Sequence, residues 1–264
     1  MPWSIDDILG STDRPDQPRA VAILLHGFLG YKDYGLIRAL GAGLASRGVL
    51  VHRFNHRHSG MTESLERFER PDAFEQDTWL GQVHDVRTVH DAIDDGTLEG
   101  KELPCFYIGH SRGGATMLLA SSRETRPLAG VVTLAAPSSC LRLTPEQIEV
   151  YREQGFLAVR SSRTGQDLRV GLPWLTEQER DPDAHDPCRA ASMLRAPLRV
   201  IHGDADPTVP PGDAFDLARA ARVTPVLVPG ANHVFDTPNP WQGDLGPALV
   251  TVLDDVERFV VANI

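Results

Sequence analysis

The chain has 264 residues, a hydrophobic content of 41% and a formal net charge of −10 at pH 7. This length suits one large α/β domain or two small ones. The acidic excess would repel polyanions, which argues against nucleic acid or an anionic membrane as partner. We expect a soluble cytoplasmic protein, because the N-terminus lacks a signal-peptide pattern and no apolar run reaches the roughly 18 residues of a membrane span.

The first part of the chain predicts strands alternating with helices. Residues 1–18 leave room for at most one edge strand. A continuous apolar run predicts a strand over 20–25 that is covered on both faces, and residues 49–54 predict the next strand. Between them, leucines at every fourth residue predict a helix over 34–47. Residues 55–73 are polar and irregular, and predict a loop over one face of the sheet.

The same alternation continues through the middle of the chain. Apolar side chains three to five residues apart predict one helix from Phe74 to about Gly96. Strands are expected at 105–110 and 130–135, with a helix to about Glu124 between them. Such alternation indicates a mostly parallel sheet of six to eight strands, wound by right-handed crossovers and flanked by helices.

The pattern breaks at residues 138–194. The tetrapeptide Thr144-Pro145-Glu146-Gln147 predicts a helix start, with a capping threonine, proline at the first position and glutamine three residues after the cap. Apolar pairs on either side of residues 163–167 predict an antiparallel hairpin, and Asp186-Pro187 predicts a further helix through Leu194. This helix-plus-hairpin insertion is a candidate lid, with a structural buttress as the alternative.

The wound pattern returns after residue 194. Strands are expected at 198–201 and 225–228, and helices at 211–221 and 247–261. The predicted division of the chain is therefore an α/β core of residues 1–137 and 195–264, and an inserted lid of residues 138–194.

A Gly-x-Ser-x-Gly motif, Gly109-His110-Ser111-Arg112-Gly113, ends an apolar strand and precedes a helix. In such an elbow the serine takes a strained backbone conformation, and the glycines leave room where any Cβ would clash. Ser111 is therefore the candidate nucleophile. The motif alone is weak, since a tight turn without chemistry also fits it, so its meaning depends on partners elsewhere in the chain.

A serine nucleophile needs a base and a carboxylate that orients the base. In a wound sheet these groups converge from loops at the carboxyl ends of strands. His233 follows the strand at 225–228, and both Asp204 and Asp206 follow the strand at 198–201. The spacing Gly-x-x-Asp-x-x-Val-Pro favours Asp206, while Asp204 stays an alternative whose other role would be to cap the turn.

The tetrahedral intermediate requires two main-chain N–H donors. Arg112 directly follows the nucleophile, and Phe28 follows the first long strand in His26-Gly27-Phe28. We predict these two residues as the oxyanion hole, and His26 as a hydrogen-bonded structural histidine rather than a base.

Other chemically capable residues have plainer interpretations. His52, His56 and His58 have a tempting spacing, but an extended chain does not converge residues four apart, so no metal and no cofactor are predicted. The cysteines, three in number and without a C-x-x-C pair, predict neither zinc nor a disulfide framework.

Several aromatic side chains and one arginine leave alternatives open. Trp174, Phe156, Tyr31 and Tyr34 could line an acyl pocket or pin the insertion to the core. The Arg112 guanidinium could bind an anionic substrate or pair with an acidic neighbour.

Together these motifs resemble the α/β hydrolase superfamily over nearly the whole chain, in particular the bacterial esterases related to feruloyl and cinnamoyl esterases and dienelactone hydrolases. The matching pieces are His26-Gly27-Phe28, Gly109-His110-Ser111-Arg112-Gly113-Gly114, His202-Gly203-Asp204-Ala205-Asp206 with Val209-Pro210, and Asn232-His233. Residues 56–61 depart from the Arg-Gly-x-Gly-x-Ser that relatives often carry, which leaves substrate preference open.

The resemblance implies a serine hydrolase that cleaves small-molecule carboxylic esters of small to medium acyl groups through an acyl-enzyme on Ser111. A serine at the elbow excludes the dehalogenases and epoxide hydrolases that use aspartate there. Thioesterase, acyltransferase, lactonase and peptidase chemistry stay open, as does a low-turnover ligand-binding protein with this fold. The hairpin or an edge strand could also pair across a homodimer.

Overall fold

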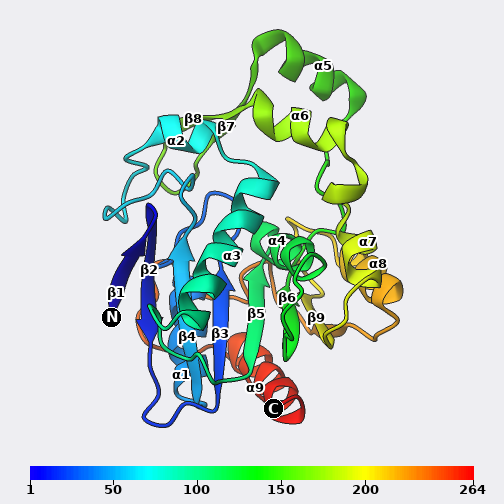
Figure 1. Ribbon diagram of the computed structural model, residues 1–264. Helices are drawn as coiled ribbons and strands as arrows, with labels where there is room; N and C mark the ends of the chain where they lie inside the picture. The colour runs from blue at the N-terminus through cyan, green and yellow to red at the C-terminus, as the bar shows by residue number, and fades with distance from the viewer.

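The computed structural model describes all 264 residues. Its centre is an eight-stranded sheet with the strand order β1-β2-β4-β3-β5-β6-β9-β10, covered by helices on both faces (Figure 1). The strands are β1 Pro2–Ile5, β2 Ile8–Asp13, β3 Ala20–Leu25, β4 Val49–Asn55, β5 Cys105–His110, β6 Gly130–Leu134, β9 Leu198–Gly203 and β10 Val226–Val228. Only β2 runs against its neighbours, so the sheet is mostly parallel as predicted.

The N-terminal residues correct the expectation of at most one edge strand. Strands β1 and β2, of four and six residues, form an antiparallel hairpin. Its turn consists of Asp6 and Asp7, which both have positive φ, 46° and 66°. A two-residue turn of this kind matches the twist of the paired strands and uses no further chain. Two strands therefore fit where the sequence length had suggested one.

The helices form two layers, one on each face of the sheet. Alternate residues of β3 face opposite layers, which explains its continuous apolar run: Ile23 packs with α3 and α4, and Leu24 packs with α1 and α9. The main helices are α1 Gly35–Ala45, α3 Trp79–Asp94, α4 Arg112–Ser121, α8 Gly212–Ala221 and α9 Pro247–Ala262. None of the helices is both long and apolar enough to cross a membrane.

The single helix predicted from Phe74 to Gly96 is wrong, because the chain forms two helices there. A short α2, Pro71–Glu75, contains Phe74, and α3 begins only at Trp79. Thr78 separates them in extended conformation, and its hydroxyl oxygen accepts a hydrogen bond from the Gly81 N–H at 3.0 Å. Thr78 thus caps α3 and prevents a continuous helix.

The insertion leaves the sheet after β6 and returns at β9, and part of it rises above the carboxyl ends of the strands (Figure 1). Its elements are α5 Pro145–Gln154, β7 Phe156–Arg160, β8 Asp167–Gly171, α6 Leu172–Arg180, the 3₁₀ turn η1 Asp183–His185 and α7 Pro187–Ser192. The predicted capping box at Thr144 is confirmed, as is the hairpin, in which Leu157 pairs with Val170. Helix α6 was not predicted.

Two side chains of the insertion bond to the main chain of the core. The Glu177 carboxylate accepts hydrogen bonds from the first two N–H groups of α3, those of Trp79 and Leu80. The Gln166 side chain bonds both main-chain groups of Phe68, at 2.7 and 3.0 Å. The insertion is therefore attached to α3 and to the loop after β4.

A fully buried arginine joins the N-terminal hairpin to the loop after β3. Arg53 of β4 donates from Nε to Asp13 of β2 at 2.6 Å, and from Nη1 to the Lys32 carbonyl at 2.7 Å. It also pairs with the Asp33 carboxylate, whose pKa is held below its usual value, since hydrogen bonds and charges from Lys32 and Arg53 outweigh the opposing effect of burial. Two carboxylates thus compensate one buried cation.

Candidate active site

Ser111 lies at the sharp turn between β5 and α4. Its φ of 53° and ψ of −125° are strained for a residue with a side chain. A Cβ on Gly109 would lie 2.3 Å from the Gly113 oxygen, and one on Gly113 would lie 2.4 Å from the His26 oxygen. The turn therefore requires both glycines, as the motif predicts, and it presents Ser111 at the carboxyl edge of the sheet.

Asp206 and His233 meet at the same edge, from the loops after β9 and β10. Asp206 Oδ2 lies 2.7 Å from His233 Nδ1. Its other oxygen accepts the N–H groups of Thr208 and Val209 at 2.8 and 3.0 Å. Burial opposes ionisation, but these bonds and His202 Nε2 at 3.1 Å hold the pKa of Asp206 well below its ordinary value. An ionised Asp206 keeps the proton on Nδ1 and leaves Nε2 of His233 free to act as a base.

Asp204, the alternative acid, bonds elsewhere. Its Oδ1 accepts the Gly230 N–H at 2.6 Å, and it makes no hydrogen bond to His233. This is the turn-capping role that the sequence offered as its plainer interpretation.

Ser111 and His233 line one cavity of about 200 Å³, which also borders the Phe28 loop.

His110, the residue before Ser111, holds the main chain of His233 in place, because its Nε2 donates to the His233 carbonyl at 2.8 Å. Burial, and then the neighbouring His233, lower the pKa of His110 to about 3. The sequence analysis missed this residue, whose only signal is its place inside the elbow motif.

The two predicted oxyanion donors come from different elements beside Ser111. The Phe28 N–H has no hydrogen-bond acceptor within the protein. Arg112 is the first residue of α4, where helix N–H groups lack intrahelical acceptors. A Cβ on Gly27 would lie 2.9 Å from Ser111 Cβ, so only glycine lets the Phe28 loop approach this closely.

His26 is buried and donates from Nδ1 to the Gly27 carbonyl at 2.8 Å. Burial, and then the stacked His56 ring, lower its pKa to about 3. The neutral ring holds the turn of the Phe28 loop, the structural role expected for it. No group of three or more His, Cys, Asp or Glu side chains is placed to hold a metal ion.

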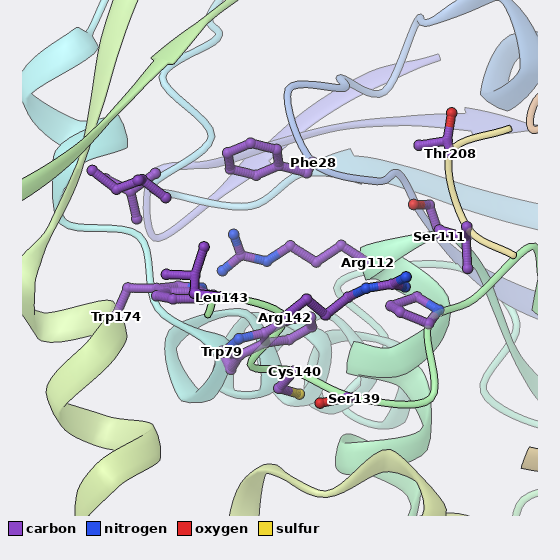
Figure 2. A pocket seen from close by; sticks show the side chains of 14 residues that line it. Phe28, Trp79, Ser111, Arg112, Ser139, Cys140, Arg142, Leu143, Trp174 and Thr208 are labelled. Atoms are coloured by element: carbon purple, nitrogen blue, oxygen red, sulfur yellow. The ribbon is translucent and has the colours of Figure 1, made fainter. Parts of the chain in front are cut away.

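A second cavity of about 230 Å³ also borders Ser111 and is lined in part by the insertion (Figure 2). Leu143, Leu157, Val170 and Trp174 of the insertion form much of its wall. The remaining lining residues are Phe28, Trp79, Ser111, Arg112, Pro137, Ser139, Cys140, Arg142, Thr208 and Val209.

The four aromatic candidates divide between different surroundings. Trp174 lines the second cavity, whose wall is mostly apolar, and Tyr34 lines the cavity that Ser111 shares with His233. Tyr31 is buried against Tyr34, with its ring edge toward the Tyr34 ring. Phe156 lines neither cavity, and the Arg169 guanidinium lies 4.2 Å above its ring. One of the two insertion aromatics therefore faces the apolar cavity.

Residues 16–189 match the family model described as serine aminopeptidase, S33. The chain is 25% identical to a monoacylglycerol lipase of Mycolicibacterium smegmatis, with 95% of this chain and 91% of the relative covered.

Solved structures share the fold. Est1E from Butyrivibrio proteoclasticus, in a complex with ferulic acid, superposes with a TM-score of 0.72 at 20% identity over 100% of this chain and 98% of that one. A dienelactone hydrolase from Anabaena variabilis has a TM-score of 0.62 at 15% identity over 100% and 96%. The architecture is thus the α/β hydrolase fold that the sequence predicted.

Proposed function

Because the chain belongs to the S33 serine aminopeptidase family of α/β hydrolases, we propose that it hydrolyses small-molecule carboxylic esters through an acyl-enzyme on Ser111. One observation carries this proposal: Ser111 borders both a cavity shared with His233 and an apolar cavity beneath the insertion. The second cavity, of about 230 Å³, suits a small to medium acyl group.

In the first half of the proposed reaction, Ser111 Oγ attacks the ester carbonyl while His233 Nε2 accepts its proton. The Phe28 and Arg112 N–H groups donate to the oxyanion, and each such donor is worth about 10²–10³ in rate. Asp206, bonded to Nδ1 at 2.7 Å, stabilises the imidazolium. His233 then gives the proton to the leaving oxygen, the C–O bond breaks, and the alcohol departs.

The second half repeats these steps with water. His233 removes a proton from a water molecule, whose oxygen attacks the acyl carbonyl. The same two N–H groups receive the oxyanion, and Ser111 leaves with the proton returned by His233. We propose that the insertion at 138–194 serves as the lid over the acyl group, since its side chains form much of the apolar wall.

The linings favour esters over the aminopeptidase reaction named in the family description. An aminopeptidase must bind the ammonium group of its substrate, which an acidic side chain does best. No Asp or Glu lines either cavity, whereas Arg112 and Arg142 line the apolar one. A cationic amino terminus would meet two like charges there.

The proposal is tested with a fluorophosphonate probe and p-nitrophenyl esters of increasing acyl length. The wild type should be labelled and should hydrolyse the shorter esters, and Ser111→Ala should lose both activities, with kcat reduced about 10⁴-fold or more. Ser139→Ala, a serine in the same apolar cavity, is the matched control and should keep both. An unlabelled wild type, or hydrolysis confined to aminoacyl p-nitroanilides, would contradict the proposal.

A further inference from the structure

The Arg112 side chain is buried, with 8% of its surface exposed, although its main chain belongs to the elbow. It extends from the elbow along the apolar cavity, beneath Phe28 (Figure 2). The guanidinium carbon lies 4.5 Å from the centre of the Trp79 ring and 5.5 Å from that of Phe28. Two aromatic rings thus hold a cation inside the cavity that we assign to the acyl group.

Apart from an ion pair with Asp77, this guanidinium has no partner within the protein. It donates no hydrogen bond to any protein acceptor, and both Nε and Nη2 are fully buried. Its one charged neighbour is Asp77, whose Oδ2 lies 3.1 Å from Nη2. Since a buried donor without an acceptor costs free energy and is rare in folded proteins, these N–H groups call for a partner.

Asp77 compensates the charge but is itself shared. Both of its oxygens accept from Gln82 Nε2, at 2.9 and 3.1 Å, and His56 Nδ1 lies 3.4 Å away. Burial raises the pKa of Asp77 to about 6, against the effect of Arg112. No carboxylate lines the cavity wall, and Arg142 adds a second cation. With only the Asp77 ion pair inside the protein, Arg112 has N–H groups left to donate to a molecule that fills the cavity.

On the basis of the proposed function, we propose that Arg112 determines substrate specificity. Its guanidinium donates hydrogen bonds to an oxygen on the acyl chain, so the preferred substrates are esters of oxo- or carboxy-substituted acids. The main-chain N–H of the same residue is a predicted oxyanion donor. One residue therefore fixes the distance between the reacting carbonyl and the second oxygen. Such a site rejects the analogue that lacks the acceptor, because its buried donors are then left unpaired.

The test compares esters that carry a carbonyl or carboxylate on the acyl chain with plain esters of matched chain length. Hydrolysis of methyl 4-oxopentanoate and methyl pentanoate, of methyl 5-oxohexanoate and methyl hexanoate, and of monomethyl glutarate is followed with a pH-stat. Each rate is divided by that of alkaline hydrolysis, which removes the intrinsic reactivity of the ester. We expect kcat/KM of the wild type to be about 10- to 100-fold higher for at least one oxygenated ester than for its plain partner.

Arg112→Met should reduce this preference to about one, since it keeps an apolar stem without donors. The preference is the readout, because the rate itself also depends on the Arg112 main chain. Should this variant fold poorly with Asp77 unpaired, Arg112→Met combined with Asp77→Asn gives the same comparison. Arg142→Met, which removes the cavity's other cation, is the control and should keep the preference.

Three results overturn the inference. The first is plain esters cleaved by the wild type as fast as their oxygenated partners, which leaves the proposed function intact. The second is a preference that survives Arg112→Met or disappears in Arg142→Met. The third is no ester hydrolysis by the wild type, in which case the proposed function fails as well. Preference for glutarate alone would identify a carboxylate as the acceptor, and preference for the oxo esters a neutral carbonyl, both within the proposal.

Discussion

The carboxyl edge of the sheet and the insertion above it are held in different ways. At the sheet edge, short loops and hydrogen bonds fix each group: two main-chain N–H groups bond Asp206, and the side chains of Asp206 and His110 bond His233. The insertion bonds to the core through a few side chains, with Glu177 and Gln166 the clearest.

This difference separates reactivity from selection of the substrate. The groups proposed to make and break bonds belong to the core, where a small displacement is expensive. Much of the wall around the acyl cavity belongs to the insertion, which can change without moving Ser111. If so, core substitutions should affect turnover most, and insertion substitutions should affect attachment and stability. Four measurements test whether the core and the insertion differ in this way.

The largest effect is expected at Asp206, the proposed acid of the triad. Asp206→Asn should lower kcat on a p-nitrophenyl ester about 10³- to 10⁴-fold, because an amide no longer favours the Nδ1–H tautomer of His233. Asp204→Asn, two residues away, should cost less than about tenfold, since its Oδ1 bonds only the Gly230 N–H. Steady-state kinetics of both variants decide the matter, and a larger loss for Asp204→Asn would reverse the assignment.

A single methyl group in the Phe28 loop should cost about 10²-fold in kcat. The new Cβ of Gly27→Ala would lie 2.9 Å from Ser111 Cβ and 3.3 Å from the His110 oxygen, so the loop and its N–H donor must move. Gly212→Ala, whose Cβ would contact nothing within 4 Å, is the matched control. Wild-type kcat in Gly27→Ala would show that the loop is not tightly placed.

The attachment of the insertion is tested by Glu177→Gln. The amide keeps an acceptor oxygen for the first N–H groups of α3 but loses the charge that favours a helix N-terminus, which should lower the free energy of unfolding by about 1–2 kcal/mol. Glu179→Gln on the same helix removes only an exposed pair with Arg152, so its urea unfolding curve should shift by less than about 0.5 kcal/mol. Equal losses would remove the special role of Glu177.

The fourth measurement concerns the pH dependence of stability. His110 has a pKa lowered to about 3, so below its ordinary value of 6.5 the unfolded chain binds a proton that the folded protein does not. This lowers the free energy of unfolding as pH falls from 6.5 toward 3, by at most about 1.4 kcal/mol per pH unit. His110→Gln keeps a donor near the His233 carbonyl and should show a slope shallower by that amount. Urea unfolding from pH 6 to 4.5 measures it, with the exposed His84→Gln expected to follow the wild type.

Much of the sheet was predictable because its signals are local. The strand at Ala20–Leu25 is apolar throughout since its two faces meet two helix layers. Thr144 and Gln147 show the start of α5 within four residues. Helix α6 has no such signal: its cap is Gly171, which offers no capping side chain, and it begins Leu172-Pro173. The hairpin turn at Asp6 and Asp7 depends on positive φ values, and two consecutive aspartates do not by themselves indicate such a turn.

Part of the site could likewise be predicted from the sequence, and part of it could not. Ser111, Asp206 and His233 follow from the motifs and the topology, because loops after parallel strands converge at one edge. The environment of Arg112 does not follow, since Asp77 comes from the break between α2 and α3, where the sequence predicted unbroken helix. Phe156 and Trp174 are both aromatic residues of the insertion, and the sequence does not distinguish them. In the structure Trp174 lines the apolar cavity, whereas Phe156 lies under the Arg169 guanidinium.

Through Arg53, the first thirteen residues are connected to the segment next to the Phe28 loop. Its guanidinium bonds Asp13 of the N-terminal hairpin on one side and the Lys32 carbonyl on the other, a few residues beyond the Phe28 loop. The outermost strands therefore help to hold the segment that carries Phe28, a proposed oxyanion donor. A chain trimmed of its first thirteen residues would lose one of the carboxylates that balance this buried cation, and its defect should appear in turnover as well as in folding.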